Sequence, residues 1–198
     1  MSKKIVAAAA AALTLLGAPA AHAKGVAANL GGCTPLAALE HPFAPWGDNG
    51  FYVLHPGGNM ESGLAGWTLS GGAAVVPGDD GLGVLAGANV LALPAGATAV
   101  TSPICIDDSF THARLLGRST VAAGSTLSVD VLYTDIKGKS VVKGSKSFSV
   151  KHAAWAPSSD FDINAKLNGA APVQFRFTAP KNSGWLVDDF YVDPRSRG

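Results

Sequence analysis

The stretch "PVQFRFT" (residues 172–178) decides the fold class of this chain. Val173, Phe175 and Phe177 are apolar, and the residues between them are polar or charged. Side chains of a β-strand point alternately to its two faces, so a period of two indicates a strand with one face on a core and one in water. The stretch therefore predicts a strand of an antiparallel sheet that has one face on the core and the other in solvent.

The same texture extends on both sides of this stretch, from Phe51 to the C-terminus. Short apolar-polar alternations such as "STLSVDVLYTD" (125–135) are separated by turn residues, and the chain contains 24 Gly and 12 Pro. "KSVVKGSKSFSVK" (139–151) has a glycine inside it, which predicts a bulge or a hairpin turn. Roughly nine to eleven short strands at this spacing are typical of an all-β sandwich. We therefore predict a two-sheet antiparallel β-sandwich over residues 51–198, in one domain.

The first 23 residues have the pattern of a secretory signal peptide. Lys3 and Lys4 precede an apolar run over residues 5–16, and residues 21–23 (AHA) fit the small-x-small cleavage pattern. The apolar run is too short to cross a bilayer. We expect a secreted, extracellular protein without a membrane span; the alternative for this segment is an ordinary N-terminal helix.

Residues 24–50 precede the strands and show no steady periodicity. They mix Gly, Pro and small residues, which predicts an irregular N-terminal arm rather than a separate domain. Cys33, Phe43 and Trp46 are its candidate anchors.

The charge balance excludes one class of partner. Cleavage after Ala23 would leave 175 residues and would remove Lys3 and Lys4. The remaining 13 Lys and Arg against 14 Asp and Glu give a formal net charge of −1. A near-neutral chain without a basic stripe argues against nucleic acid as a ligand.

The chain contains two cysteines, Cys33 and Cys105, and neither has a CxxC neighbour. In an exported protein an even count predicts a disulfide. Such a bond would close a loop of about 70 residues and stabilise the fold by roughly 4 kcal/mol. The alternative is two separate buried thiols.

Two motifs lie at the ends of the predicted sandwich. "PGGNMESGLAGW" (56–67) resembles the G-x-F-E-x-G-x-x-G-W opening of the jelly-roll carbohydrate-binding modules, the galactose-binding-like group, with Met60 in the place of Phe. "GWLVDDFYVDP" (184–194) resembles the closing strand of that group. The layout is also similar to small secreted actinobacterial proteins of unknown function, which share "GWTLSGGA", "TSPxC" and "W-x-x-DD-x-YVDP". The resemblance implies a jelly roll whose first turn and last strand meet.

Many members of that group hold a structural calcium at one edge of the sandwich. The resemblance implies Glu61 and one of Asp188 or Asp189 as ligands, with backbone carbonyls near Asp79 to Gly81. Calcium takes six to eight hard oxygen ligands and accepts loop carbonyls. For Glu61 the alternative is a capping carboxylate that accepts N–H groups of the glycine turn.

The candidate calcium ligands leave two points open. Asp79-Asp80 followed by Gly81 also fits a plain turn. Because adjacent strand residues point to opposite faces, we expect one of Asp188 and Asp189 to face inward, toward a metal or an arginine, and the other to face solvent.

Four tryptophans divide into two expected roles. Trp67 and Trp185 lie in motif strands, and we expect them in the core. Trp155 lies in the loop-like "KHAAWAPSSDFD", and Trp46 lies in "FAPWGDN". An exposed ring in a loop can stack on a sugar, so these two are the candidate ligand-binding residues; the alternative is packing over a sheet edge.

No sequence signature of catalysis is present. The chain has no GxSxG and no HExxH, and its histidines are scattered singly. We therefore predict a non-enzymatic binding module, with a polysaccharide or other glycan as its ligand. The alternatives are a structural or protein-interaction component of the cell envelope and a glycoside hydrolase using Glu61 with Asp188 or Asp189.

Overall fold

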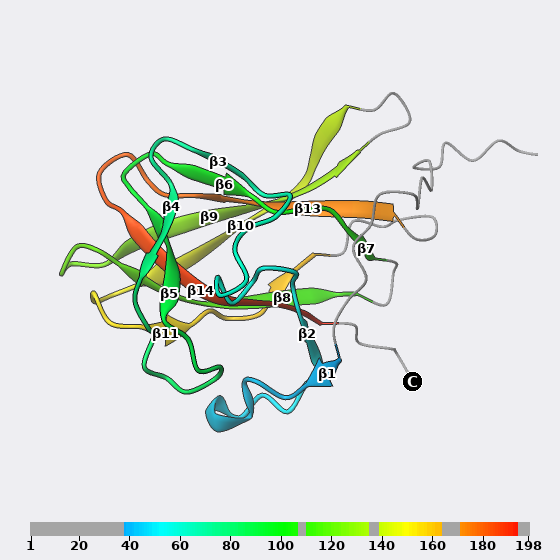
Figure 1. Ribbon diagram of the computed structural model, residues 1–198, viewed down its shortest axis with the longest axis horizontal. Coiled ribbons are helices and arrows are strands. Elements are labelled where there is room, and N and C mark those ends of the chain that lie inside the picture. The colour runs from blue at the N-terminus through cyan, green and yellow to red at the C-terminus, as the bar shows by residue number, and fades with distance from the viewer. Residues whose placement is uncertain (1–37, 107–109, 135–138, 164–170, 194–198) are drawn as a thin grey trace, which may run out of the picture.

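The computed structural model describes residues 38–106, 110–134, 139–163 and 171–193 (Figure 1). Within these ranges two antiparallel sheets pack face to face, and one turn of 3-10 helix (η2, Ala44–Trp46) is the only helical element. The predicted two-sheet antiparallel β-sandwich is confirmed. None of these residues forms a helix long and apolar enough to span a membrane.

Fourteen strands are described, three more than the sequence predicts at most. Three of them, β1, β11 and β12, are only two residues long. A pairing that short shows no period of two, so sequence patterning cannot detect it. The strands are Leu39–Glu40 (β1), Tyr52–Leu54 (β2), Thr68–Ser70 (β3), Ala74–Pro77 (β4), Asn89–Leu93 (β5), Thr98–Val100 (β6), Ile104–Ile106 (β7), His112–Ser119 (β8), Ser125–Thr134 (β9), Ser140–Val150 (β10), Ala156–Pro157 (β11), Phe161–Asp162 (β12), Ala171–Thr178 (β13) and Trp185–Asp193 (β14).

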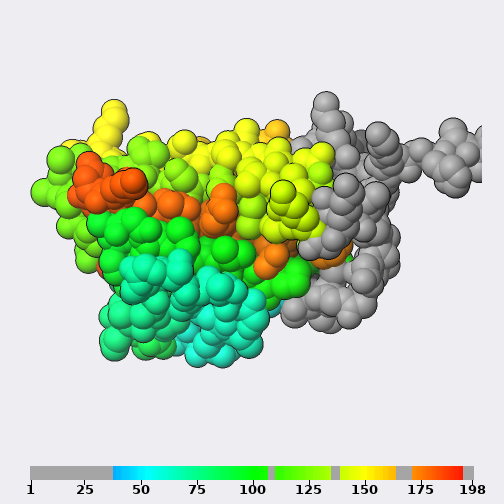
Figure 2. Space-filling model, turned by 90° about the horizontal axis from the view of Figure 1, so that it is seen from above, coloured from blue at the N-terminus to red at the C-terminus, as the bar shows by residue number. Residues whose placement is uncertain are grey.

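The six-stranded sheet is built around β13. Its order is β10-β9-β13-β6-β3. Both β6 and β7 pair with the same edge of β13: β6 with residues 176–178 and β7 with residues 171–173. Figure 2 looks onto the outer face of this sheet, where β13 (orange) lies between β6 (green) and the yellow-green hairpin of β9 and β10. Burial alternates along β13, with Val173, Phe175 and Phe177 fully buried. The predicted strand at residues 172–178 is confirmed.

The predicted irregularity at Gly144 is a bulge. The register of β10 against β9 shifts between Val142 and Gly144. Beyond the shift, Phe148 lies opposite Leu127 and turns inward, while Ser147 and Ser149 lie on the outer face.

The eight-stranded sheet is built around β14. Strand β8 pairs along one edge of β14, β5 and β2 share the other edge, and β4, β1, β11 and β12 extend the sheet. Almost every residue of β14 is buried, so both of its faces are covered. This explains why "WLVDDFYVD" shows no clean alternation of apolar and polar residues.

The main core fills the space between the sheets. It contains the side chains of Leu91, Phe175, Trp185 and Phe190, all fully buried. Trp185 is therefore a core residue, as predicted. Trp67 is half-buried; its indole N–H donates to the carbonyl of Pro56 (3.0 Å) and its ring stacks on Phe177.

A second apolar cluster lies on the outer face of the eight-stranded sheet. Tyr52, Leu116 and Tyr191 project there, on the faces of β2, β8 and β14 opposite the main core, and Phe43 of the arm packs against them. The described part of the predicted arm, residues 38–50, is thus packed on the sandwich through a fully buried phenylalanine ring. Residues 1–37, which include the predicted signal peptide and Cys33, lie outside the described residues.

Candidate functional site

The opening turn and the closing strand meet through the backbone. His55 N–H donates to the carbonyl of Phe190 (2.9 Å), and Phe190 N–H donates to the carbonyl of Gly58 (3.0 Å). The contact is so close that a Cβ on Gly58 would lie 2.5 Å from the Phe190 oxygen. The expectation that the two motif segments meet in space is confirmed.

Glu61 joins this turn to the start of β5. Its Oε1 accepts hydrogen bonds from the N–H groups of Ala88 (2.7 Å) and Asn89 (2.8 Å), and its Oε2 accepts one from Asn89 Nδ2 (3.0 Å). The alternative interpretation of Glu61 was a carboxylate that accepts N–H groups of the glycine turn. The carboxylate does accept N–H groups, but they belong to Asn89 at the start of β5 and to Ala88 before it. The hydrogen bond from Ala88 is the main cause that lowers the Glu61 pKa. A general acid needs a raised pKa, so Glu61 is not suited to the general-acid role in glycoside hydrolysis.

Asp188 and Asp189 are both buried, and the expectation that one faces solvent is wrong. The register of β14 against β8 shifts between Asp188 and Tyr191, and Asp189 has a φ of 44°. This bulge interrupts the alternation of the strand, so both carboxylates stay inside the protein. Asp188 Oδ1 accepts the N–H of Asp189 (2.8 Å), and Asp189 Oδ2 accepts the N–H of Leu85 (3.2 Å).

A third carboxylate of this region, Asp80, was not predicted as a ligand. It is 5% exposed; its Oδ1 accepts the N–H of Leu82, while its Oδ2 is buried without a hydrogen-bond partner. Its neighbour Asp79 is exposed and accepts the N–H of Gly81 (3.0 Å), which is the plain-turn alternative for that residue. In "GDDG" the second aspartate, not the first, turns inward; the sequence offers no signal that distinguishes them.

The three buried carboxylates Asp80, Asp188 and Asp189 repel one another. Burial is the largest cause that raises the pKa of each of the three. The negative charge of Asp189 raises the pKa of Asp188 further, and the negative charge of Asp80 raises the pKa of Asp189 further. We call these three residues the acidic cluster. Such a group is stabilised by protons or by a cation.

The acidic cluster can be judged as a calcium site by its donor set. Within the described ranges, no group of three or more His, Cys, Asp or Glu side chains is arranged to hold a metal ion. The unpaired Oδ2 of Asp80 nevertheless faces no donor, and calcium readily takes backbone carbonyls in addition to carboxylates. The residues therefore fit a calcium site of few carboxylates and several carbonyls. Glu61 accepts N–H groups with both carboxylate oxygens, and Asp79 is exposed, so both fit it less well.

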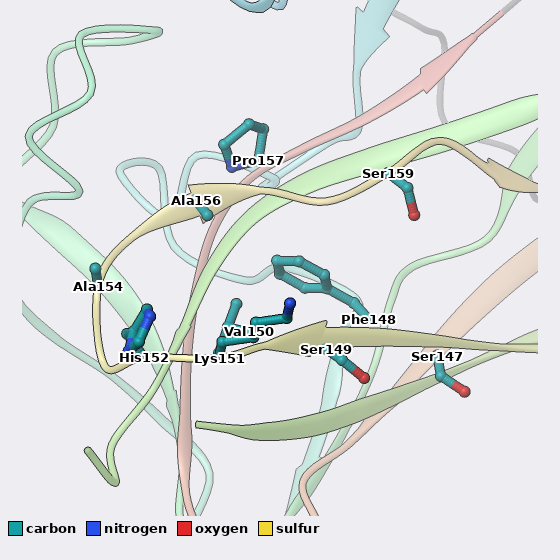
Figure 3. A pocket seen from close by; sticks show the side chains of 10 residues that line it. All are labelled: Ser147, Phe148, Ser149, Val150, Lys151, His152, Ala154, Ala156, Pro157 and Ser159. Atoms are coloured by element: carbon teal, nitrogen blue, oxygen red, sulfur yellow. The ribbon is translucent and has the colours of Figure 1, made fainter. Parts of the chain in front are cut away.

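A groove of about 520 Å³ lies between the segment that carries β11 and the edge of β10 with which no described strand pairs (Figure 3). Phe148, Lys151 and His152 line one side, and Pro157 and Ser159 line the other. In Figure 3 the Lys151 side chain runs back along β10 toward the Phe148 ring, inside the groove.

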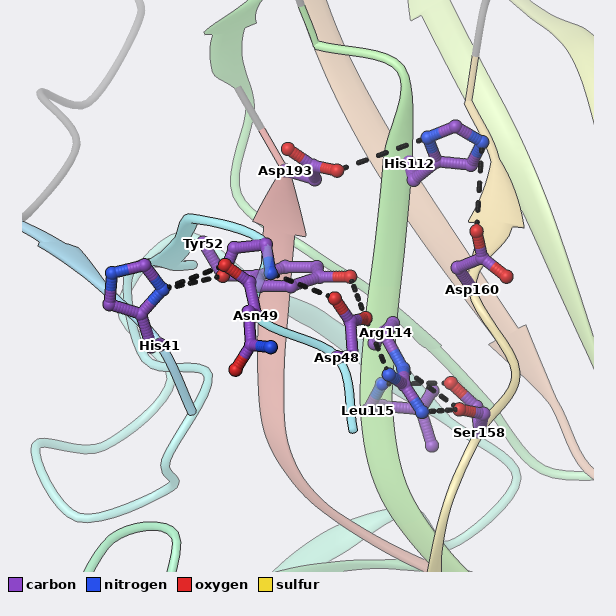
Figure 4. Close-up of polar contacts among 11 residues, drawn as sticks. His41, Asp48, Asn49, Tyr52, His112, Arg114, Leu115, Ser158, Asp160 and Asp193 are labelled. Atoms are coloured by element: carbon purple, nitrogen blue, oxygen red, sulfur yellow. Dashed lines mark hydrogen bonds and ion pairs between the residues drawn. The ribbon is translucent and has the colours of Figure 1, made fainter. Parts of the chain in front are cut away.

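Arg114 organises a second region, on the outer face of the eight-stranded sheet (Figure 4). Its Nη1 donates to Asp48 Oδ2 (2.6 Å), and its Nε and Nη2 donate to the carbonyl of Ser158 (2.9 and 2.6 Å). The guanidinium carbon lies 4.4 Å from the centre of the Phe43 ring. Tyr52 OH also donates to Asp48 Oδ2 (2.6 Å). Burial raises the Asp48 pKa, but the hydrogen bonds from Tyr52, Gly50 and Arg114 outweigh it, and the pKa is lowered.

Trp46 lies beside this network, over a shallow hollow of about 600 Å³. The hollow is lined by Trp46, Asp48, Asn49, Arg114 and Asp160, among others. The Trp46 side chain is 38% exposed, and Asn49 and Asp160 are also exposed. We call this feature the Trp46 hollow: an accessible ring beside exposed polar groups, on a base held by the Arg114 hydrogen bonds.

Trp155 does not have the exposed ring that stacking on a sugar would require. It is half-buried, packs against the second apolar cluster, and lies under the Arg118 guanidinium at 5.8 Å. The alternative, packing over the sheet, describes its place better. Leu82, Val84 and Leu85 of the glycine-rich middle loop pack on the same cluster, which the small and polar appearance of "GDDGLGVLAGAN" does not indicate.

Cys105 lies in β7, while Cys33 lies outside the described residues, so their disulfide stays a prediction.

No known family model matches the sequence, and no curated protein matches it. Solved structures of similar fold include an arabinose-bound GH51 α-L-arabinofuranosidase (14% identity, 71% of this chain and 26% of that one, TM-score 0.49). A xylan-binding domain of family CBM22 is 17% identical to this chain, the match covers 68% of this chain and 90% of that domain, and the TM-score is 0.43. A family 16 carbohydrate-binding module is 19% identical to this chain, the match covers 70% of this chain and 98% of the module, and the TM-score is 0.47.

The chain spans about a quarter of the length of the first two such structures, the arabinofuranosidase and a Clostridium thermocellum xylanase with its CBM22 module (26% and 27%). The TM-scores of the arabinofuranosidase and of the two binding modules all lie below 0.5, so the function has to be argued from the chain's own residues.

Proposed function

We propose that this protein is a secreted, non-catalytic module that binds a glycan at the Trp46 hollow. The supporting observation is the exposed Trp46 ring above a polar base whose side chains are already fixed by hydrogen bonds. A sugar ring has an apolar face for the tryptophan and hydroxyls for Asn49 and Asp160. Because Arg114 and Asp48 are held before any ligand arrives, little ordering entropy opposes binding.

Trp46→Ala is expected to lower glycan affinity at least tenfold, because large aromatic anchors dominate such sites. The measurement is affinity electrophoresis of the full secreted chain in gels that contain xylan, β-1,4-galactan or mixed-linkage glucan. Trp155→Ala is the matched tryptophan control, and it should keep the retardation of the parent protein.

The other outcomes are equally informative. Loss of binding in Trp155→Ala alone would move the glycan to the second predicted tryptophan and overturn the Trp46 hollow. Absence of binding to all three polymers would favour the alternative, a structural or protein-interaction component of the cell envelope. Release of reducing ends that Glu61→Gln abolishes would overturn the non-catalytic assignment.

We further propose that the acidic cluster holds a structural calcium ion. Asp80 and one of Asp188 or Asp189 would bind it together with loop carbonyls, and the ion would offset the mutual repulsion of the acidic cluster. When bound, calcium would fix the 80–85 loop against the bulge of β14; it would have no part in a reaction.

A chelator is therefore expected to destabilise the protein. Calcium at about 100 times its Kd adds roughly 2.7 kcal/mol, so EDTA should lower the melting temperature by roughly 5–10 °C and calcium should restore it. Asp80→Asn should abolish this response, whereas the neighbouring Asp79→Asn should keep it. An identical melting curve in EDTA and in calcium would refute the calcium site.

A further inference from the structure

The cations of the described chain are concentrated on one strand. Lys139, Lys143, Lys146 and Lys151 lie on or directly beside β10 and make up four of the eight Lys and Arg that the structure describes. No Asp or Glu occurs between residues 139 and 159. β10 pairs with β9 on one side only, so its other edge is free among the described strands.

The neighbouring strand does not neutralise this edge. Asp130 is the one carboxylate of β9, and it accepts hydrogen bonds from Arg176 Nε (2.9 Å), Arg176 Nη2 (2.5 Å) and Ser145 Oγ (2.5 Å). Its charge is thus already engaged. The other ten described carboxylates lie on strands of the eight-stranded sheet or in the loops that follow them. Among the described residues the two sheets therefore carry opposite charge, although the net charge of the chain is small.

The groove of Figure 3 lies against this basic edge. Lys151 enters it, His152 lies at one end, and the Ser159 hydroxyl points toward β10 from the other side, while Ser147 and Ser149 point away from the groove. An ammonium group in a groove of about 520 Å³ can bind an anionic group of a ligand, and the Ser159 hydroxyl can hydrogen-bond to that ligand.

We propose that the β10 edge and this groove bind a polyanionic polysaccharide, at a site that adjoins the Trp46 hollow at Ser159 but does not include Trp46. An eleven-residue strand is about 36 Å long, so its lysines can follow several successive sugars of an extended chain. A low-dielectric groove of one charge sign also raises the local concentration of anionic ligands.

The same surface is less suited to the two other common polyanions. Single-stranded nucleic acid needs exposed rings for base stacking, but Phe148 is 6% exposed and Tyr133 lies under the Lys143 ammonium at 4.8 Å. Attachment to anionic lipid needs a row of exposed apolar side chains, and Val142 is the only large one on β10.

The test compares two lysines that are both exposed and differ only in place. Lys151→Glu changes the groove, and Lys181→Glu makes the same change of charge in the loop after β13. Binding of the full chain to polygalacturonate (carboxylate), dextran sulfate (sulfate) and neutral dextran is measured by biolayer interferometry at low and high salt. We expect binding to one or both anionic polymers and not to dextran. Lys151→Glu should lower that affinity roughly tenfold, and Lys181→Glu less than about twofold.

The polymer that binds identifies the anionic group. Equal losses in the two lysine variants would show that only the net charge matters and would overturn the site. Binding to vesicles of phosphatidylglycerol without binding to either polymer would also overturn it. So would a lack of binding to every probe, since lysines on an edge strand can serve simply to prevent strand pairing between molecules. Trp46→Ala should leave binding to the anionic polymer unchanged, so this proposal and the proposed function fail independently.

Discussion

Arg114→Ala is expected to lower the free energy of unfolding by about 3–4 kcal/mol, the largest effect that we predict. Arg114 is almost fully buried, and its guanidinium holds Asp48, the Ser158 carbonyl and the Phe43 ring at once. Its removal leaves a half-buried Asp48 carboxylate without its cation and the Ser158 carbonyl without its donors, and each of these losses is costly. Urea denaturation followed by tryptophan fluorescence measures the change.

Arg118→Ala is the matched control, since it removes the same charge from the same strand. Arg118 is half-buried and its guanidinium lies 5.8 Å from the Trp155 ring, a cation–π contact rather than a buried salt bridge, so its loss should cost about 1 kcal/mol or less. If Arg114→Ala lowered the free energy of unfolding no more than Arg118→Ala, the Arg114–Asp48 ion pair would not be what holds the arm on the sandwich. A destabilised Arg114→Ala protein should also lose glycan affinity, because the base of the Trp46 hollow would no longer be fixed.

Gly58→Ala is expected to destabilise the sandwich by about 3 kcal/mol. The added Cβ would lie 2.5 Å from the Phe190 oxygen and 2.8 Å from the His55 oxygen, and both are backbone atoms that no side-chain rotation can move. The backbone of the opening turn or of the β14 bulge must shift, and the two hydrogen bonds between them would weaken. Thermal and urea unfolding of the variant provide the measurement.

Gly144→Ala separates this clash from a general effect of replacing glycine. The only atom near its added Cβ is Val131 Cγ2 at 4.0 Å, which is ordinary contact, so Gly144→Ala should change stability by less than about 0.5 kcal/mol. A Gly58→Ala protein as stable as the Gly144→Ala protein would show that the turn and the closing strand do not approach each other so closely.

Much of the fold could be predicted because it depends on local periodicity. Val173, Phe175 and Phe177 alternate with polar residues, and in β13 they are the buried face. Gly144 predicted an irregularity in β10, and a bulge lies there. The meeting of the two end motifs came from a resemblance, and the His55–Phe190 and Phe190–Gly58 hydrogen bonds confirm it.

The candidate sites were predicted less well, and each error has a physical cause. Asp188 and Asp189 were expected on opposite faces, because the alternation rule assumes a regular strand and Asp189 departs from it with a φ of 44°. Asp80 was overlooked beside Asp79, because which carboxylate of a turn points inward depends on what the turn packs against. Trp155 was a candidate sugar-binding ring with packing over the sheet edge as its alternative, and the second apolar cluster half-buries it.

The sequence by itself determined the all-β class and the positions of the longer strands, because these follow from residue patterns within short segments. The contact of the two end motifs followed from the resemblance to a known family. Only the tertiary structure decided which polar groups come together. Arg114 and Asp48 are 66 residues apart, and Leu85 and Asp189 are 104 apart. The separation of charge between the two sheets is likewise invisible in a net charge near zero. Such arrangements depend on which strands become neighbours, and local periodicity carries no information about that choice.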